Sequence, residues 1–396
     1  MSVLITASTP WLLFVACALR RVYSQSDVHL LLVTKGDAPS LQFAFDALSG
    51  GADFTSREVF SSERLSVRLH QYLTTWRARV TPGEARRQLR AEGRQLRAHL
   101  ERTDAELILV GNKFHAPERM LAQFGKQCGA TVGFYEEGLS IYQRRMYWEG
   151  SAARRLAMQA FYRFHMVHEY YGEPQFAFDE AWVSLPRAYS SGDVARLRAY
   201  GDHANLFAVA GRAVLAQHRP WAVRESLPDD AALVLSQRLS EDGLVTVDEE
   251  LGMLADAATE LLAQHGIVYF KPHPRDRIAK FARLAATVNN ARLRCLDDLH
   301  IPVEVLFSEW RPRTIVGFMS GTLVYAPLLY GIPSYTIAKS TLRRPTPGYR
   351  RFLDVIRTCG IPDLNDWRAR AVVGADAPFA VRPSPQVGGG AFPGVI

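Results

Sequence analysis

The sequence alternates short apolar runs with helix-like segments, and it does so in two separate series. Runs of the first series span residues 2–8, 28–36, 106–112 and 131–135, and runs of the second span 231–237, 267–270, 313–318 and 332–337. Near-continuous apolar strands that alternate with helices are typical of parallel sheets covered on both faces. The pattern therefore predicts an α/β protein with two Rossmann-like domains whose parallel sheets face each other across a central cleft.

The length of 396 residues suits two domains of about 150–200 residues each. We expect the first domain to span 1–226 and the second to span 227–373, because the second series of strands begins at Ala231. The tail at 374–396 is rich in glycine and proline, so we expect it to be loosely ordered.

The N-terminal residues favour a strand, a loop and a helix over a signal peptide. No basic stretch precedes the apolar residues, Thr9 suits an N-cap and Pro10 suits a first helical position. The sequence contains no uninterrupted run of about 20 apolar residues, so it predicts no membrane span. The four cysteines are widely separated and lack C-x-x-C spacing, which argues against a disulfide framework or zinc site and favours a reducing cytosol.

The formal net charge is +7, and two segments carry much of the arginine. Residues 77–102 are dense in arginine, and 143–171 mix arginine with aromatic residues and methionine. Such composition favours an acidic partner, such as an anionic glycan or phospholipid headgroups. The alternative is a solvated helix face with its aromatic residues packed inward, which is the better interpretation of either segment taken alone.

An acidic pair follows the apolar run 131–135, in the sequence Glu136-Glu137-Gly138. Two adjacent carboxylates after a buried strand are costly unless they meet water, a cation or a substrate. Gly138 allows a tight turn and close approach of a ligand. The pair therefore indicates either a base for a sugar hydroxyl or an acidic turn that caps the next helix.

A second loop follows the run 267–270 and reads Lys271-Pro272-His273-Pro274-Arg275. The prolines stiffen this loop and exclude helix. An imidazole between two cations suits the binding of a phosphate and the protonation of its departing oxygen. The alternative is a loop histidine that only bonds nearby backbone.

A third loop, Ser320-Gly321-Thr322, lies between a strand and an apolar helix. Backbone N–H groups and two hydroxyls at a helix start suit a phosphate. Plain N-capping by Ser320 or Thr322 is compatible with that role. Because ligands gather beyond the carboxyl ends of parallel strands, we expect all three loops to lie at one site.

The order of these three motifs resembles that of the bacterial GT-B sialyltransferases, which include lipooligosaccharide sialyltransferases and capsule polysialyltransferases. The resemblance extends over 231–337 and around Glu136, and it includes the stretches 233–246 and 301–310. In the family, the second stretch carries a glutamate that holds the cytidine ribose, which implies this role for Glu304. In this chain Gly321 separates the serine from the threonine of the third motif.

The resemblance implies an inverting sialyltransferase that uses CMP-sialic acid and a lipopolysaccharide or capsular polysaccharide acceptor. It implies Glu136 as the general base and His273 as the general acid, in a GT-B fold whose first domain binds the acceptor and whose second binds the nucleotide sugar. The remaining implied substrate-binding residues are Glu137, Gly138, Lys271, Pro274, Arg275, Glu304, Ser320, Gly321 and Thr322. It implies no cofactor, no metal and no nucleic-acid partner. We expect a cytoplasmic enzyme with peripheral contact at the inner face of the bacterial inner membrane.

Three other functions remain open at this point. A transferase of another CMP-activated keto-sugar, such as CMP-Kdo, would use the same chemistry. A CDP-glycerol glycerophosphotransferase shares the architecture and a similar His-Pro loop but attacks phosphorus. A catalytically inactive glycan-binding relative would not need Glu136 or His273.

Overall fold

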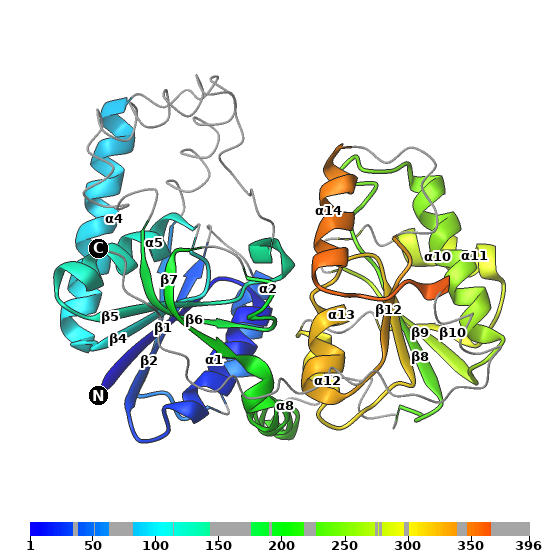
Figure 1. Ribbon diagram of the computed structural model, residues 1–396, viewed down its shortest axis with the longest axis horizontal. Helices are drawn as coiled ribbons and strands as arrows, with labels where there is room; N and C mark the ends of the chain where they lie inside the picture. The colour runs from blue at the N-terminus through cyan, green and yellow to red at the C-terminus, as the bar shows by residue number, and fades with distance from the viewer. Residues whose placement is uncertain are drawn as a thin grey trace, which may run out of the picture.

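The computed structural model contains two parallel sheets, one in each half of the chain (Figure 1). It describes residues 1–34, 39–50, 52–62, 82–113, 115–142, 176–189, 192–217, 227–273, 276, 279–296, 301–338 and 347–365. The first sheet has seven parallel strands in the order β3-β2-β1-β4-β5-β6-β7. These strands are β1 (Ser2–Ala7), β2 (Asp27–Thr34), β3 (Ser56–Ser61), β4 (Leu107–Val110), β5 (Thr131–Tyr135), β6 (Phe178–Val183) and β7 (Val194–Ala199).

The second sheet has five parallel strands in the order β10-β9-β8-β11-β12. They are β8 (Ala231–Leu235), β9 (Ile267–Lys271), β10 (Leu293–Cys295), β11 (Thr314–Gly317) and β12 (Ser334–Thr336). The strand order reverses between β1 and β4 in the first sheet and between β8 and β11 in the second. Such switch points place loops and helix starts at the carboxyl edge of a sheet, where ligands bind.

The helices form groups on the two sheets. In the first unit, α1 (Pro10–Val22), α2 (Pro39–Ser49) and α8 (Ala204–Gln217) pack together, and α4 (Pro82–Thr103) packs with α5 (Ala116–Gln127). In the second unit, α10 (Val247–Leu262) packs with α11 (Ala279–Val288). The other segments are α12 (Val303–Leu306), α13 (Thr322–Tyr325), α14 (Pro347–Thr358) and the short turns η1 (Leu139–Tyr142), η2 (Tyr200–His203) and η3 (Ala326–Tyr330).

Local chemistry explains two of these helix boundaries. The Thr9 side chain accepts a hydrogen bond from the Leu12 N–H at 3.2 Å and Pro10 opens α1, which confirms the predicted start of this helix. The predicted apolar helix after Thr322 is α13 followed by the π-helical turn η3. Pro327 lies in this turn and has no N–H to continue the α-helical bonding.

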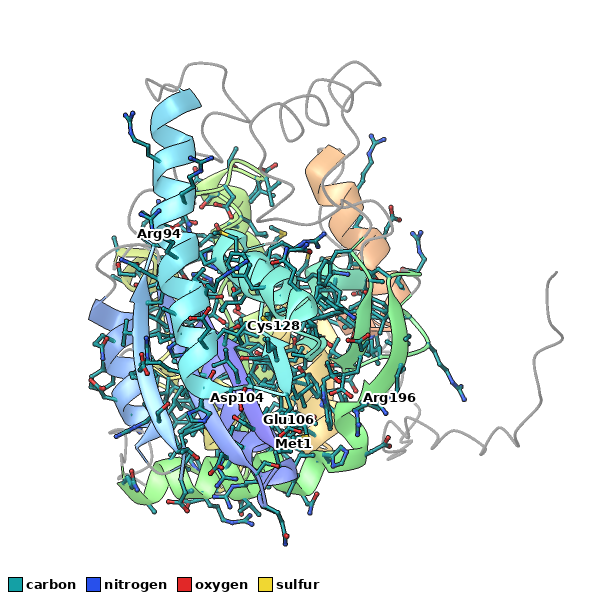
Figure 2. All side chains as sticks on the ribbon, turned by 90° about the vertical axis from the view of Figure 1, so that its left-hand side faces the viewer. Met1, Arg94, Asp104, Glu106, Cys128 and Arg196 are labelled. Carbon is teal, nitrogen blue, oxygen red and sulfur yellow. The ribbon has the colours of Figure 1, made fainter. Side chains whose placement is uncertain are left out.

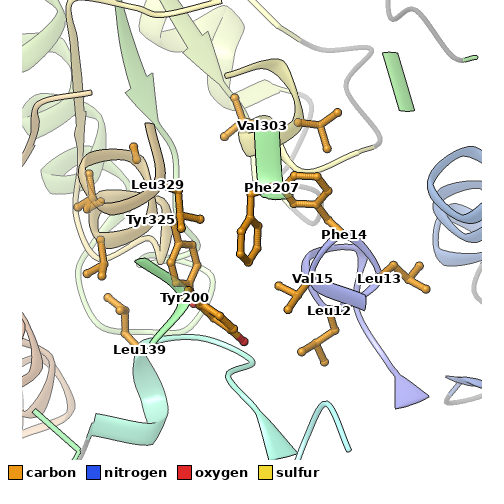
Figure 3. Packing of buried hydrophobic residues seen from close by; sticks show 14 of the residues in the cluster. Leu12, Leu13, Phe14, Val15, Leu139, Tyr200, Phe207, Val303, Tyr325 and Leu329 are labelled. Atoms are coloured by element: carbon orange, nitrogen blue, oxygen red, sulfur yellow. The ribbon is translucent and has the colours of Figure 1, made fainter. Parts of the chain in front are cut away.

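The two units share one hydrophobic cluster, to which Phe207 of α8 belongs (Figure 3). Helix α8 packs on α1 and α2 of the first unit and on α12 and η3 of the second. Close packing requires Gly211, because an added Cβ there would lie 2.8 Å from the Ser308 side chain. Aromatic residues fill the contact: the Phe207 ring lies 6.0 Å from Phe14 and 5.4 Å from Tyr200.

The structure tests other parts of the sequence interpretation. All four cysteines are free, as predicted. Among the described residues, no helix is long and apolar enough to cross a membrane. The proposed boundary at 226/227 stays a prediction, although one sheet lies on each side of it. The tail 374–396 and the arginine-aromatic segment 143–171 lie outside the described residues.

Candidate active site

Glu136 follows β5 and is completely buried. Its Oε2 accepts hydrogen bonds from the Tyr142 hydroxyl at 2.6 Å and from the Ser184 N–H at 2.5 Å. Both donors belong to the first unit, since Tyr142 ends η1 and Ser184 follows β6. Two strong donors on one oxygen fix the carboxyl group in a single orientation.

The other oxygen of Glu136 meets the second unit. The Tyr325 hydroxyl, at the end of α13, donates to Oε1 at 2.9 Å. Burial raises the pKa of the Glu136 carboxyl, and the three hydrogen-bond donors offset part of that rise. A carboxyl group with a raised pKa holds a proton more tightly than a free glutamate, which favours a role as a general base.

The neighbouring residues of the acidic loop are half-buried. Glu137 and Gly138 lie between Glu136 and η1, and the Ile141 N–H donates to the Gly138 carbonyl at 3.4 Å. A Cβ added at Gly138 would meet nothing within 4 Å. The predicted close approach of a ligand to Gly138 and the substrate contact of Glu137 therefore stay predictions.

The His-Pro loop follows β9 in the second unit. His273 is half-buried. Its backbone N–H donates to the Asp276 carboxylate at 2.8 Å, and the backbone N–H of Asp276 donates back to the His273 carbonyl at 2.8 Å. Pro274 and Arg275 lie outside the described residues. The aspartate thus closes a tight turn that fixes the backbone of the candidate general acid.

Asp276 is itself held by a buried ion cluster that sequence analysis missed. Lys280 on α11 donates to Asp276 at 2.9 Å, to Glu250 at 2.9 Å, to Glu241 at 3.1 Å and to the Gln237 carbonyl at 2.9 Å. Burial alone would lower the pKa of Lys280, but its hydrogen bonds to Asp276 and Glu250 outweigh burial and raise that pKa. The cluster joins three segments behind the His-Pro loop.

The third motif forms a relay of hydroxyl groups. Ser320 Oγ donates to Thr322 Oγ1 at 2.9 Å, and Thr322 Oγ1 donates to the buried Glu304 carboxylate at 2.7 Å. Burial raises the pKa of Glu304, and the bond from Thr322 offsets part of the rise. The structure thus brings Glu304 to the Ser320–Thr322 motif, which lies in a different segment of the sequence.

Lys271 completes this side of the site. Its ammonium donates to the Pro272 carbonyl at 2.8 Å. Burial lowers the pKa of Lys271, and the negative charge of Glu304 opposes that change. The charge of Glu304, the residue expected to bind the ribose, therefore acts on Lys271.

Gly321 separates the two hydroxyl residues for a structural reason. A Cβ added there would lie 2.6 Å from Cε2 and 3.1 Å from Cζ of Tyr325, four residues later. Helical side chains lean towards the N-terminus, so residue 325 covers residue 321. The glycine therefore leaves the space in which the Tyr325 ring reaches Glu136.

A second buried carboxylate lies at the switch point of the first sheet, and sequence analysis missed it as well. Glu118 accepts hydrogen bonds from Thr6 Oγ1 at 2.7 Å and from the N–H groups of Gly111 and Asn112 at 3.0 and 3.1 Å. His115 Nδ1 lies 2.9 Å from its other oxygen. The signal was a glutamate in the first turn of a helix that begins a few residues after a buried strand.

The arginine-dense segment is helix α4 over its described part. Arg87, Arg90, Arg94 and Arg97 are exposed and recur at intervals of three or four residues, which places them on one side of the helix. Figure 2 shows Arg94 on α4. Arg97 also lies 4.7 Å above the Phe124 ring and donates to Gln127 at 3.0 Å. All four arginines of the stripe are thus exposed, and Arg97 in addition contacts Phe124 and Gln127 of α5.

Among the described residues, no group of three or more histidine, cysteine, aspartate or glutamate side chains could hold a metal ion. The residues of the three motifs instead offer hydroxyl, carboxyl and cationic groups. All three motifs follow the carboxyl ends of strands, because β5 leads to Glu136, β9 to Lys271 and β11 to Ser320. That they form one site stays a prediction.

Two Rossmann-like units joined in this way define a GT-B protein. The fold is similar to that of a protein from Listeria monocytogenes assigned as a UDP-N-acetylglucosamine 2-epimerase, with a TM-score of 0.54 and 10% identity over 93% of this chain and 86% of that chain. It is also similar to UGT73P12 of Glycyrrhiza uralensis in complex with glycyrrhetinic acid 3-O-monoglucuronide. The TM-score is 0.50, and the identity is 10% over 90% of this chain and 79% of that chain. These likenesses show the fold alone.

The family model of alpha-2,8-polysialyltransferases (POLYST) matches residues 4–339. The chain therefore belongs to the alpha-2,8-polysialyltransferase family. No curated protein matches the sequence. The match covers both sheets from β1 to β12, which confirms the resemblance to bacterial sialyltransferases and the predicted GT-B fold, and it makes this protein a glycosyltransferase of the sialyltransferase type.

Proposed function

We propose that the protein transfers sialic acid from CMP-sialic acid to a glycan acceptor at the bacterial cell surface, with inversion at the anomeric carbon. The observation that carries this proposal is the hydrogen bond between Tyr325 and Glu136. It brings the acidic loop of the first unit within one helical turn of the Ser320–Thr322 motif of the second. A base and a phosphate site on opposite sides of one sugar are what a single displacement requires.

In the proposed mechanism, Glu136 takes the proton of the acceptor hydroxyl while that oxygen forms a bond to the anomeric carbon. The bond from this carbon to the phosphate oxygen of CMP breaks in the same step. His273 supplies a proton, or positive charge, to the departing phosphate. The hydroxyl groups of Ser320 and Thr322 and the Lys271 ammonium stabilise the growing negative charge of the leaving CMP.

The assignment of donor groups follows the relay in the second unit. Glu304 would bind the ribose hydroxyls, since its buried carboxylate accepts a hydrogen bond from Thr322 and its charge acts on Lys271. The exposed arginines of α4 support contact with an anionic acceptor or with the anionic inner face of the membrane. In this mechanism protein side chains alone move the protons and stabilise the leaving group, so we expect transfer without a metal ion.

The test is a comparison of donors with the purified protein. We expect CMP release from CMP-sialic acid in the presence of a labelled α-2,8-linked oligosialic acid, product growth by sialic acid units in mass spectra, and an α-linkage by NMR. We also expect EDTA to leave the rate unchanged. Faster turnover of CMP-Kdo or CDP-glycerol would contradict the assigned donor, and loss of activity in EDTA would contradict metal-independent transfer.

Replacing Glu304 by glutamine is expected to raise KM for CMP-sialic acid about tenfold, because the ribose loses a charge-assisted hydrogen bond. The acceptor KM should not change. Steady-state kinetics with each substrate varied in turn measure both values. Glu309→Gln is the matched control, since Glu309 is an exposed carboxylate on the same segment. Equal donor KM values for the two variants would remove the ribose role of Glu304.

A further inference from the structure

The two oxygens of Glu136 have partners in different units. Tyr142 and Ser184 hold Oε2 from within the first unit, whereas Tyr325 reaches Oε1 from the second. The side chain is completely buried, so an acceptor hydroxyl cannot reach it while this contact persists. If Glu136 is the base, the group that must leave first is the one that comes from the other unit.

The ring of Tyr325 also occupies a distinct place. It stacks on Trp11 at the start of α1, with ring centroids 4.0 Å apart and planes inclined by 10°. The indole N–H of Trp11 donates to the backbone carbonyl of Glu136 at 3.3 Å, so the indole is fixed beside the carboxyl group. Figure 3 shows Tyr325 within the aromatic cluster beside Tyr200.

An acceptor sugar has the same two features as this tyrosine. Its ring presents an apolar face of C–H groups that can be buried against an aromatic side chain, and a hydroxyl extends from its edge. A tyrosine on the face of Trp11 with its hydroxyl on Glu136 Oε1 therefore makes the contacts that a bound acceptor would need.

We propose that Tyr325 occupies the acceptor subsite in this arrangement, and that the subsite consists of the Trp11 face and Glu136 Oε1. When the acceptor binds, Tyr325 withdraws, a sugar ring stacks on Trp11 and its hydroxyl donates to Oε1. The other oxygen keeps its bonds to Tyr142 and Ser184, so the carboxyl group stays oriented. This inference rests on the proposed role of Glu136 as the general base.

Gly321 fits this interpretation. Its missing side chain provides the space for the Tyr325 ring. An interdomain contact that served packing alone would not need the tyrosine hydroxyl to enter a buried carboxyl site, because a phenylalanine would stack equally well on Trp11.

The experiment measures binding of a fluorescent α-2,8-linked oligosialic acid by polarisation, without donor. Tyr325→Phe should bind this probe about tenfold more tightly than the native protein, because the competing hydrogen bond to a carboxylate is lost. Tyr330→Phe is the matched control: it lies one turn further along, is equally buried, and its hydroxyl makes no hydrogen bond with the described residues. Equal or weaker binding by Tyr325→Phe, or no binding by any of the three proteins, would overturn the proposal.

The stacking role of Trp11 is tested with the same probe. Trp11→Leu should weaken binding at least about tenfold, and Trp11→Phe should weaken it less, because a smaller aromatic face remains. Affinity for CMP, which binds to the second unit in this scheme, should not change and shows that the variants are folded. Native affinity of Trp11→Leu for the probe would contradict the subsite. Failure of the proposed function is seen separately, as absence of CMP release by the native protein.

Discussion

Replacing Glu136 by glutamine is expected to lower kcat by about 10²–10⁴-fold, which is the usual contribution of a general base. Glutamine has the same shape and its amide oxygen can still accept from Tyr142 and Ser184. Its amide nitrogen can donate to the oxygen of Tyr325 in place of the present bond. The fold should therefore remain, and only the proton acceptor is lost.

The measurement is the steady-state rate of sialic acid transfer, with CMP affinity as a check on folding. Glu136→Asp is the matched variant, because it keeps the charge but shortens the side chain. It should retain more activity than glutamine if the carboxylate accepts a proton. Turnover of Glu136→Gln at the native rate would remove the assignment of this residue.

The same substitution should raise the melting temperature at pH values above the raised pKa of Glu136. Burial raises the pKa of Glu136 above its ordinary value of 4.5 in the folded protein. The folded state then binds this proton more tightly than the unfolded state, so stability falls as the pH rises from 4.5 to the raised value and stays lower above it. Glutamine cannot ionise, and the variant should lose less stability over this interval. A pH series of thermal unfolding curves measures the difference.

The fold was predictable because each strand carries its own signal. Strands buried on both faces need continuous apolar residues, and this requirement identified most strands of both sheets before any contact was known. The edge strand β3 lacks that signal, since its residues alternate between exposed and half-buried. The three motifs could be placed because the residue that follows a parallel strand lies at the carboxyl edge of the sheet.

The surroundings of the motifs could not be predicted in the same way. Tyr142, Ser184 and Tyr325 meet at Glu136 only because distant segments pack together, and a buried tyrosine hydroxyl has no local sequence pattern. Gly321 interrupts the Ser/Thr motif, and only the position of the Tyr325 ring explains it. A lysine on a helix is usually exposed, so nothing in the sequence indicated that Lys280 is buried.

Replacing Lys280 by methionine is expected to lower the free energy of unfolding by about 3–5 kcal/mol, because it leaves buried carboxylates without their cation. Methionine fills a similar volume but donates no hydrogen bond. Asp276, Glu250 and Glu241 would then face one another, since all three accept from the Lys280 ammonium within 3.1 Å. A loss of this size is a large fraction of the stability of a typical protein.

The consequence for catalysis follows from the turn that the cluster holds. Asp276 accepts hydrogen bonds from Lys280 and from the backbone N–H of His273. Without Lys280, repulsion among the carboxylates should therefore displace the His-Pro loop and raise KM for CMP-sialic acid. Denaturant unfolding and steady-state kinetics measure the two effects. Arg283→Met is the matched control, because Arg283 lies on the same helix and pairs with Asp248 at 2.8 Å on the surface, where an ion pair contributes about 0–1 kcal/mol. Similar losses of unfolding free energy in both variants would contradict this role, because the buried cluster would then stabilise the protein no more than a surface ion pair does.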